Sequence, residues 1–267
     1  MVGTRDLSVK RPSAKQIDAD NAGLGLSRGA GATTVQAMLP SRQGAIRLFR
    51  VVGITVFLHW SWFLFGALII QQRRVYYDSL LWNVLEYLTL FALVLMHEFG
   101  HALGCRQVGG RADEIVLWPL GGVAFVAPPP RPGAVLWSLA AGPLVNVALL
   151  PVFYALSLFA VSSGWYQNNP NGMQWLDAAS FINRTLLIFN MLPIFPLDGG
   201  QILRALLWYG MGPVRSLLVA TSIGFVGVAI LVYLAWANRS IWIAIMAAFV
   251  FMNCRSAWLQ AWEARKR

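Results

Sequence analysis

Two histidines and a glutamate in the segment His97-Glu98-Phe99-Gly100-His101 have the types and spacing that bind a metal ion and use it for hydrolysis. In a helix, residues four apart lie on one face, so both imidazoles can coordinate the same ion. Neutral imidazole nitrogens suit Zn²⁺. A carboxylate beside the open coordination position can take a proton from a water molecule there, which then attacks a peptide carbonyl. The pattern therefore predicts zinc peptidase chemistry, with Glu98 as the base.

The surroundings of this motif argue against a chance match. The chain has three histidines, and two of them occupy the motif. The motif also lies inside an apolar run, residues 80–103, where an ionisable side chain is costly and is a functional candidate by default. The third histidine, His59, lies beside Trp60, and we interpret it as a hydrogen-bonded structural group rather than a third ligand.

The composition predicts a protein that crosses a membrane several times. Of the 267 residues, 57% are hydrophobic and 12% are charged, and the mean hydropathy is +0.58, which is outside the range of ordinary soluble domains. Apolar runs lie at about 51–70, 80–103, 134–161, 181–196, 216–236 and 240–253. About 20 apolar residues span the hydrocarbon core, so the fourth run must continue through 201–209 after a break, and the sixth must extend toward Trp258. We expect an all-α polytopic membrane protein, with about six transmembrane helices in a domain at 45–258.

The basic residues are distributed in a way that predicts topology. The net charge of +10 could suggest a nucleic-acid partner. With six spans and a cytoplasmic N-terminus, however, cytoplasmic segments would hold 17 of the 21 Lys and Arg, eight before Val51 and nine later. This positive-inside bias predicts that both termini are cytoplasmic, and it explains the charge without a nucleic-acid partner. We expect a multi-pass protein of the bacterial cytoplasmic membrane. Residues 1–44 read as a disordered cytoplasmic tail, and 259–267 as a short basic one.

A short β-hairpin is expected between the second and third spans. Residues 113–126 contain β-branched and aromatic side chains on either side of Pro119-Leu-Gly-Gly, which is a hairpin pattern. An apolar hairpin on the inner side of a membrane is tolerated where its backbone is buried in protein or lines a wet cavity. We therefore expect this hairpin to be associated with the membrane.

A break in the fourth span supplies a third candidate ligand. Prolines 193 and 196 and a glycine pair interrupt the run, and Asp198 is the only acid there. A carboxylate at this point would complete a three-ligand site with one position free for water, which is the catalytic pattern of zinc. Asp198 could also cap the helix that follows, a role compatible with ligation.

Other polar residues in the spans have less specific interpretations. Glu86 and Arg184 should lie at similar depths, which motivates the hypothesis that they pair. The alternative is that both side chains extend to the outer interface. Asn146 can hydrogen-bond across spans, which could be packing alone.

Four motifs together resemble the site-2 protease family of intramembrane zinc metalloproteases. They are His97-Glu-Phe-Gly-His101, Pro119-Leu-Gly-Gly, Gly142-Pro-Leu-Val-Asn146 and Asn190-Met-Leu-Pro-Ile-Phe-Pro-Leu-Asp198-Gly-Gly. The similarity covers about residues 46–209. It implies that His97, His101 and Asp198 bind one Zn²⁺ per chain and that Glu98 is the catalytic acid and base. It also implies that Asn190 and Asn146 are polar groups near the scissile carbonyl that help to stabilise the oxyanion.

The resemblance further implies a single-span membrane protein as substrate, such as a membrane-anchored regulator, cut near the cytoplasmic side in regulated intramembrane proteolysis. The hairpin at 115–126 resembles the family's membrane-embedded edge, where an extended substrate could add a strand. No stretch is long enough for an inserted PDZ domain and no CBS domain follows Trp262. We therefore expect a compact form controlled by a partner, by a second copy, by prior trimming of the substrate or by the N-terminal tail.

A non-proteolytic zinc-binding scaffold or transporter is the alternative function. Glu98 discriminates between the two, because a site that only binds or transports a metal needs no base beside its histidines. The intact Glu98 favours the enzyme.

Overall fold

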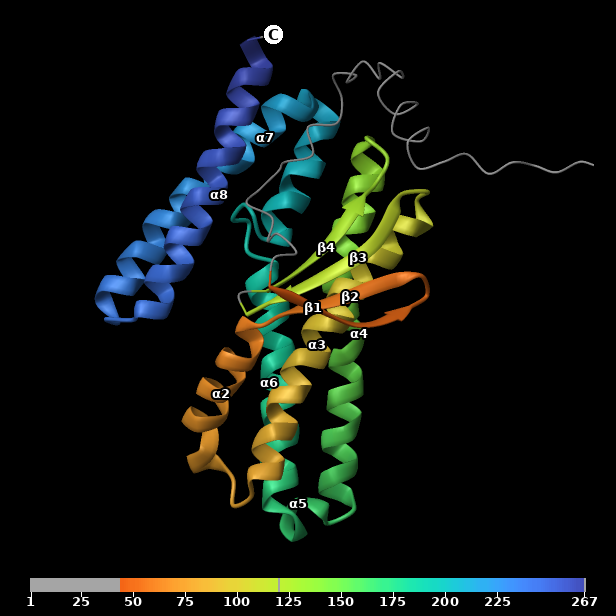
Figure 1. Ribbon diagram of the computed structural model, residues 1–267, viewed down its shortest axis with the longest axis vertical. Coiled ribbons are helices and arrows are strands. Elements are labelled where there is room, and N and C mark those ends of the chain that lie inside the picture. Colours follow the sequence, from red (N-terminus) through yellow and green to blue (C-terminus); the bar gives the residue numbers. More distant parts are fainter. Residues whose placement is uncertain (1–43, 120, 267) are drawn as a thin grey trace, which may run out of the picture. The chain divides into compact units, whose positions relative to one another are not determined.

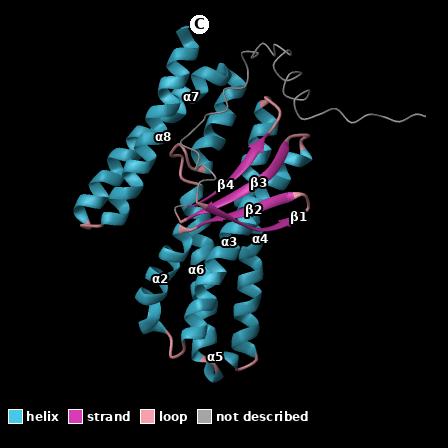
Figure 2. Cartoon of the chain, in the orientation of Figure 1, coloured by secondary structure: helices cyan, strands magenta, loops and turns pink. Residues whose placement is uncertain are grey.

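A four-stranded sheet lies among the helices of this chain. The computed structural model describes residues 44–119 and 121–266, so all but the last residue of the predicted tail at 1–44 falls outside it. The strands are β1 (Ala45–Val51), β2 (Ile54–His59), β3 (Arg111–Trp118) and β4 (Gly121–Ala127), in the order β1-β2-β3-β4 (Figures 1 and 2). The expected all-α fold with one hairpin is therefore corrected to a mainly helical fold with a larger sheet.

The sheet joins two parts of the chain that are about 50 residues apart. β1 and β3 pair antiparallel with β2 and β4, respectively, while β2 and β3 are parallel, with Phe57 opposite Val116. The connection from β2 to β3 contains two α-helices, α2 (Ser61–Arg73) and α3 (Leu80–Gln107). Because β2 leads into α2 and α3 leads into β3, the parallel pairing brings the start of α2 and the end of α3 to the same sheet.

The first apolar run, 51–70, does not form one helix as expected. Its first part is β2 and its second part is the 13-residue helix α2. The run begins with several β-branched residues, which fit a pleated, half-buried surface better than a helix. Ile54 and Val56 are fully buried in a cluster that includes Trp62 of α2. Hydropathy alone does not distinguish such a buried strand from the first residues of a transmembrane helix.

Four helices in the described part of the chain are long and apolar enough to cross a membrane. They are α3, α4 (Pro132–Ser162), α7 (Asp198–Ala237) and α8 (Ile241–Lys266). The remaining elements are η1 (Arg74–Tyr76), α5 (Trp165–Asn168) and α6 (Pro170–Asn190). α6 has 21 residues but contains Asp177 and Arg184. The expected number of about six spans is not confirmed by helix length and composition.

α7 is bent where glycine precedes proline. Gly212 has φ 78° and ψ 172°, and Pro213 follows it, so helical geometry stops and restarts inside the element. A positive φ costs glycine little, and proline is tolerated at the start of the new segment. The part after the bend packs along α8 (Figure 1). α8 continues to Lys266 and so includes most of the residues expected to form a separate basic tail.

α3 and α4 approach each other through small residues. A Cβ atom on Gly104 would lie 2.5 Å from Cβ of Ala141, and one on Gly100 would lie 2.5 Å from the carbonyl oxygen of Ala141. Small residues at a helix contact allow the backbones to come close together. α6 packs against both helices. This packing brings the face of α3 that carries the two histidines against α4.

Glu86 pairs with Arg73, so the hypothesis of a pair with Arg184 is wrong. Nε of Arg73 lies 2.7 Å from Oε1 of Glu86 and Nη2 lies 3.1 Å from Oε2, which also accepts a hydrogen bond from the Tyr77 hydroxyl. Arg184 is exposed and donates to the carbonyl of Ser180 in its own helix. Burial, together with the Glu86 contact, raises the pKa of Tyr77. The turn at η1 folds the end of α2 back onto α3. The depth of a residue along its span does not predict such a turn.

Candidate active site

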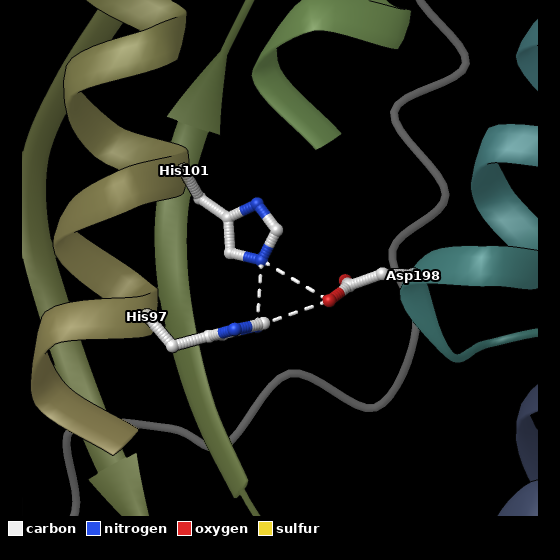
Figure 3. Close-up of side chains that lie close together, drawn as sticks. All are labelled: His97, His101 and Asp198. Atoms are coloured by element: carbon white, nitrogen blue, oxygen red, sulfur yellow. Dashed lines mark hydrogen bonds and ion pairs between the residues drawn. The ribbon is translucent and has the colours of Figure 1, made fainter. Parts of the chain in front are cut away.

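Three side chains from two distant helices converge on one point. Nε2 of His97 lies 3.0 Å from Oδ2 of Asp198, Nε2 of His101 lies 3.3 Å from the same oxygen, and the two Nε2 atoms are 3.1 Å apart. Figure 3 shows both imidazole rings of α3 directed toward the carboxylate at the start of α7. His97 and His101 are buried. The structure thus brings together two residues of a local motif and one residue about 100 positions later.

The spacing of these three donor atoms fits a zinc ion. With Zn–N and Zn–O bonds of about 2.0–2.2 Å, tetrahedral geometry separates neighbouring donor atoms by about 3.3 Å. The three distances are 3.0–3.3 Å, so a small outward movement of the donors suffices. Two imidazoles and one carboxylate are also a ligand set of catalytic zinc sites. In the described part of the chain, this is the one group of three or more potential ligand residues close enough to hold a metal.

The far nitrogen of each histidine is engaged by an acceptor. Nδ1 of His101 lies 2.9 Å from the main-chain oxygen of Ser138, and Nδ1 of His97 lies 2.7 Å from Oδ1 of Asn146. A carbonyl oxygen only accepts, so Nδ1 carries the proton in both rings and the lone pair of Nε2 faces Asp198. Contacts of this kind orient metal-ligating histidines and fix their tautomer.

The two predicted asparagines lie on different sides of His97. Nδ2 of Asn190, the last residue of α6, lies 3.4 Å from Nε2 of His97, on the side of the donor cluster. Asn146 of α4 is fully buried and contacts Nδ1 on the other side of the ring. Its amide also binds Asn183 of α6, a residue that the sequence analysis did not identify. The one feature of the sequence that could have indicated Asn183 is a polar side chain within an apolar run.

The β3–β4 hairpin holds the carboxylate of Glu98. Oε2 of this buried side chain accepts a hydrogen bond from the backbone N–H of Ala124, at 3.0 Å. A Cβ atom on Gly122 would lie 2.6 Å from Oε1. The Pro-Leu-Gly-Gly motif therefore needs its second glycine because a larger residue would occupy the space of the carboxylate.

A turn at residues 191–197 and the start of α7 position Asp198. Leu197 occupies the N-cap position and Asp198 is the first helical residue, so the acid is one residue beyond the cap that was considered for it. A carboxylate in the first turn of a helix is favoured by the helix dipole. Nε2 of Gln201 donates to the main-chain oxygen of Pro196, at 2.8 Å. This bond ties the first turn of α7 to the preceding turn.

Comparison with known proteins gives one family and several relatives. Residues 86–176 and 168–234 match Peptidase family M50. The zinc metalloprotease MJ0392 of Methanocaldococcus jannaschii is 34% identical over 209 residues, which cover 78% of this chain and 59% of that protein. Rip3 of Mycobacterium tuberculosis is 29% identical over 239 residues, covering 79% of this chain and 58% of that protein. The chain therefore spans less than two thirds of the length of these curated relatives.

The fold also matches a solved structure. The site-2 protease from Methanocaldococcus jannaschii superposes with a TM-score of 0.60 at 32% sequence identity. The match covers 80% of this chain and 95% of the solved one. The similarity thus extends over nearly all of the solved protease chain.

Proposed function

Because the chain belongs to peptidase family M50, the site-2 protease family, we propose that it is an intramembrane zinc metalloprotease. The substrate would be a membrane-anchored protein, cut within or near its transmembrane segment. The observation that carries the proposal is the convergence of donor atoms of His97, His101 and Asp198 at distances of 3.0–3.3 Å, with Glu98 beside the two histidines in α3. A site that only stores or transports a metal does not require that acid.

In this proposal His97, His101 and Asp198 hold one zinc ion per chain. When bound, zinc supplies a Lewis acid that polarises the scissile carbonyl and makes a water molecule more acidic. Glu98 accepts the proton of the attacking water and then delivers it to the leaving amide nitrogen. The hydrogen bond from Ala124 keeps the Glu98 carboxylate in place for both transfers.

The two asparagines have different roles in this proposal. The amide of Asn190 is a suitable donor to the oxyanion, because its Nδ2 lies on the Nε2 side of His97. Asn146 is fully buried on the opposite side of that ring. We therefore give Asn146 a role in orienting His97 instead of the oxyanion contact inferred from the family resemblance.

An extended substrate segment would bind along the free edge of β4. β4 is an edge strand of the described sheet, and the N–H of Ala124 points away from β3 because it bonds Glu98. N–H directions alternate along a strand, so the N–H of Val126 points to the same side. Edge strands bind peptides by main-chain hydrogen bonds. A peptide at this edge would lie next to Glu98.

The finer topology also belongs to the proposal. The protein would lie in a bacterial cytoplasmic membrane. The distribution of Lys and Arg favours cytoplasmic termini, which require an even number of crossings. The four long apolar helices satisfy this condition, and so does a count of six that includes α2 and α6. A regulatory partner or a second copy would control access.

Co-reconstitution with single-span membrane substrates tests the function. Wild type and Glu98→Gln are purified, their zinc content is measured, and each is incubated in vesicles with the same substrates. We expect about one zinc per chain in both proteins and cleavage by wild type alone. Zinc in both proteins with no cleavage by either would support the scaffold or transporter alternative. Absence of zinc from both would contradict the metal site itself.

A further inference from the structure

A chain of hydrogen bonds connects His97 to a backbone carbonyl through two buried amides. Oδ1 of Asn146 lies 2.7 Å from Nδ1 of His97, and Nδ2 of Asn146 donates to Oδ1 of Asn183 at 2.9 Å. Nδ2 of Asn183 donates in turn to the main-chain oxygen of Asn146, at 3.0 Å. Both asparagine side chains are fully buried, one in α4 and the other in α6.

From this geometry we propose that Asn183 is a positioning residue that, through Asn146, holds His97 in the one tautomer able to bind zinc. The proposal rests on the zinc site proposed above. It assigns a function to a residue of α6 that lies outside the family motifs seen in the sequence and has no contact with the donor cluster among the described hydrogen bonds.

The side-chain amide of asparagine has two chemically unlike ends. The oxygen accepts and the NH₂ group donates, yet the two ends have nearly the same shape, so packing alone does not choose between the two orientations. A main-chain carbonyl, in contrast, only accepts. Asn183 must therefore direct its NH₂ toward the carbonyl of Asn146 and its oxygen toward the Asn146 side chain. Asn146 must then direct its own oxygen toward His97.

The consequence for His97 is a fixed proton. Because Oδ1 of Asn146 only accepts, Nδ1 of His97 must carry the hydrogen, which leaves the lone pair of Nε2 free on the side of Asp198. An inverted Asn146 amide would donate to Nδ1 and move the proton to Nε2, where it would block metal binding. His101 needs no such relay because its Nδ1 contacts the main-chain oxygen of Ser138 directly. Both ligand orientations thus depend on backbone carbonyls, one directly and one through two amides.

The first test measures zinc affinity in the purified full chain by competition with a chelator. Asn183→Leu removes both hydrogen bonds and keeps the number and branching of the side-chain heavy atoms, and the control below has the same increase in volume. Loss of an orienting contact outside the ligand set typically weakens metal binding by about 10–100-fold, and we expect a decrease in this range. The matched control is Asn83→Leu. Asn83 is also buried, and its Nδ2 donates to the main-chain oxygen of Ile70, at 2.6 Å, away from the donor cluster. This control should lower thermal stability but not zinc affinity.

The second test observes the tautomer in zinc-free protein, so it does not depend on metal binding or on activity. The sequence contains three histidines, and ¹⁵N-histidine labelling therefore gives few signals, of which those of His97 are assigned by their absence in His97→Asn. Wild type should show a protonated Nδ1 at His97, whereas Asn183→Leu should show a population with protonated Nε2. Asn183→Asp, in its protonated form, can donate to the main-chain oxygen of Asn146 and accept from its side chain, and should keep the wild-type tautomer.

The outcomes separate this inference from the proposed function. If wild type binds no zinc, the metal site fails, while the tautomer experiment still decides the role of Asn183. If wild type binds zinc and Asn183→Leu has the same affinity and the same His97 tautomer, the positioning role is overturned. Equal losses of affinity in Asn183→Leu and Asn83→Leu would also overturn it, because they would indicate general destabilisation.

Discussion

A Cβ atom on Gly122 would lie 2.6 Å from Oε1 of Glu98, so the β-hairpin and the proposed catalytic carboxylate fit together only if this position has no side chain. The neighbouring N–H of Ala124 donates to the other carboxylate oxygen. The hairpin therefore sets the position of Glu98 from two sides. None of the hydrogen bonds and ion pairs described for the three residues proposed to bind zinc involves the hairpin.

Replacement of Gly122 by alanine should reduce catalysis but not metal binding. The added methyl group would push the Glu98 carboxylate out of place, and a displacement of about 1 Å in a catalytic group can cost about 100-fold in rate. We expect cleavage of a single-span substrate to fall by about that factor at unchanged zinc content. The control is Gly210→Ala, because a Cβ atom there would meet nothing within 4 Å. Wild-type turnover in Gly122→Ala would contradict the proposed positioning.

Replacement of Asp198 by asparagine should reduce zinc affinity directly. The amide is neutral and binds zinc less strongly than a carboxylate, so the loss should exceed the 10–100-fold typical of contacts outside the ligand set. Competition with a chelator measures it. Asp177→Asn, which changes an exposed carboxylate in α6, is the control. Full zinc content in Asp198→Asn at limiting metal would exclude Asp198 as a ligand.

Those parts of the candidate site that depend on local sequence could be predicted. His97 and His101 are one helical turn apart, and this spacing alone brings both rings to one face of α3. Asp198 could be identified because it is the only acid in a break between helices. Its distance of about 3 Å from both imidazoles depends on the packing of α7, which no local pattern contains.

Asn183 could not be predicted, for a related physical reason. A buried asparagine in a helix can contact any neighbouring helix, and its role follows from the side chain that happens to face it. Here that side chain is Asn146, which lies 37 positions earlier in the sequence. The same limitation applies to Asn146, because its motif does not reveal which nitrogen of His97 it contacts.

The incorrect predictions about the fold also have physical causes. A run of apolar residues satisfies the length criterion for a span whether it forms a helix or a strand. At residues 51–59 the structure has the end of β1, a turn and the strand β2. The partner of Glu86 was predicted from depth along two spans, whereas the observed pair depends on the turn after α2. Hairpin patterning was more informative, because β3 and β4 pair in antiparallel register across the expected Pro-Leu-Gly-Gly segment.

Replacement of Glu86 by glutamine should destabilise the fold and leave zinc binding unchanged. Breaking a buried ion pair typically costs about 3–5 kcal/mol, but Arg73 is 30% exposed, so solvent reduces the loss to about 1–3 kcal/mol. A lower Tm in detergent at constant zinc affinity is expected. Arg184→Gln should leave Tm unchanged, because Arg184 is exposed and bonds its own helix. A lower Tm for Arg184→Gln, with no effect of Arg73→Gln, would contradict the observed pairing.

Proline at position 126 should test whether the β4 edge binds the substrate. The N–H of Val126 is expected to point away from β3, as that of Ala124 does, so proline removes a donor from the outer edge without removing a bond of the β3–β4 ladder. Phe125 is already extended in the strand, as the residue before proline requires. Proline at an inward position such as Val116 would instead disturb the sheet itself.

The expected result of Val126→Pro is weaker cleavage of membrane substrates, by about tenfold, which corresponds to the loss of about one hydrogen bond. Zinc content should stay the same because the ligands and the contact between Ala124 and Glu98 remain. Val126→Ala is the matched control, since it shortens the side chain and keeps the N–H. If Val126→Pro and Val126→Ala reduce cleavage equally, the side chain and not the strand edge is responsible. Equal turnover of wild type and folded Val126→Pro would show that the substrate does not bind this edge.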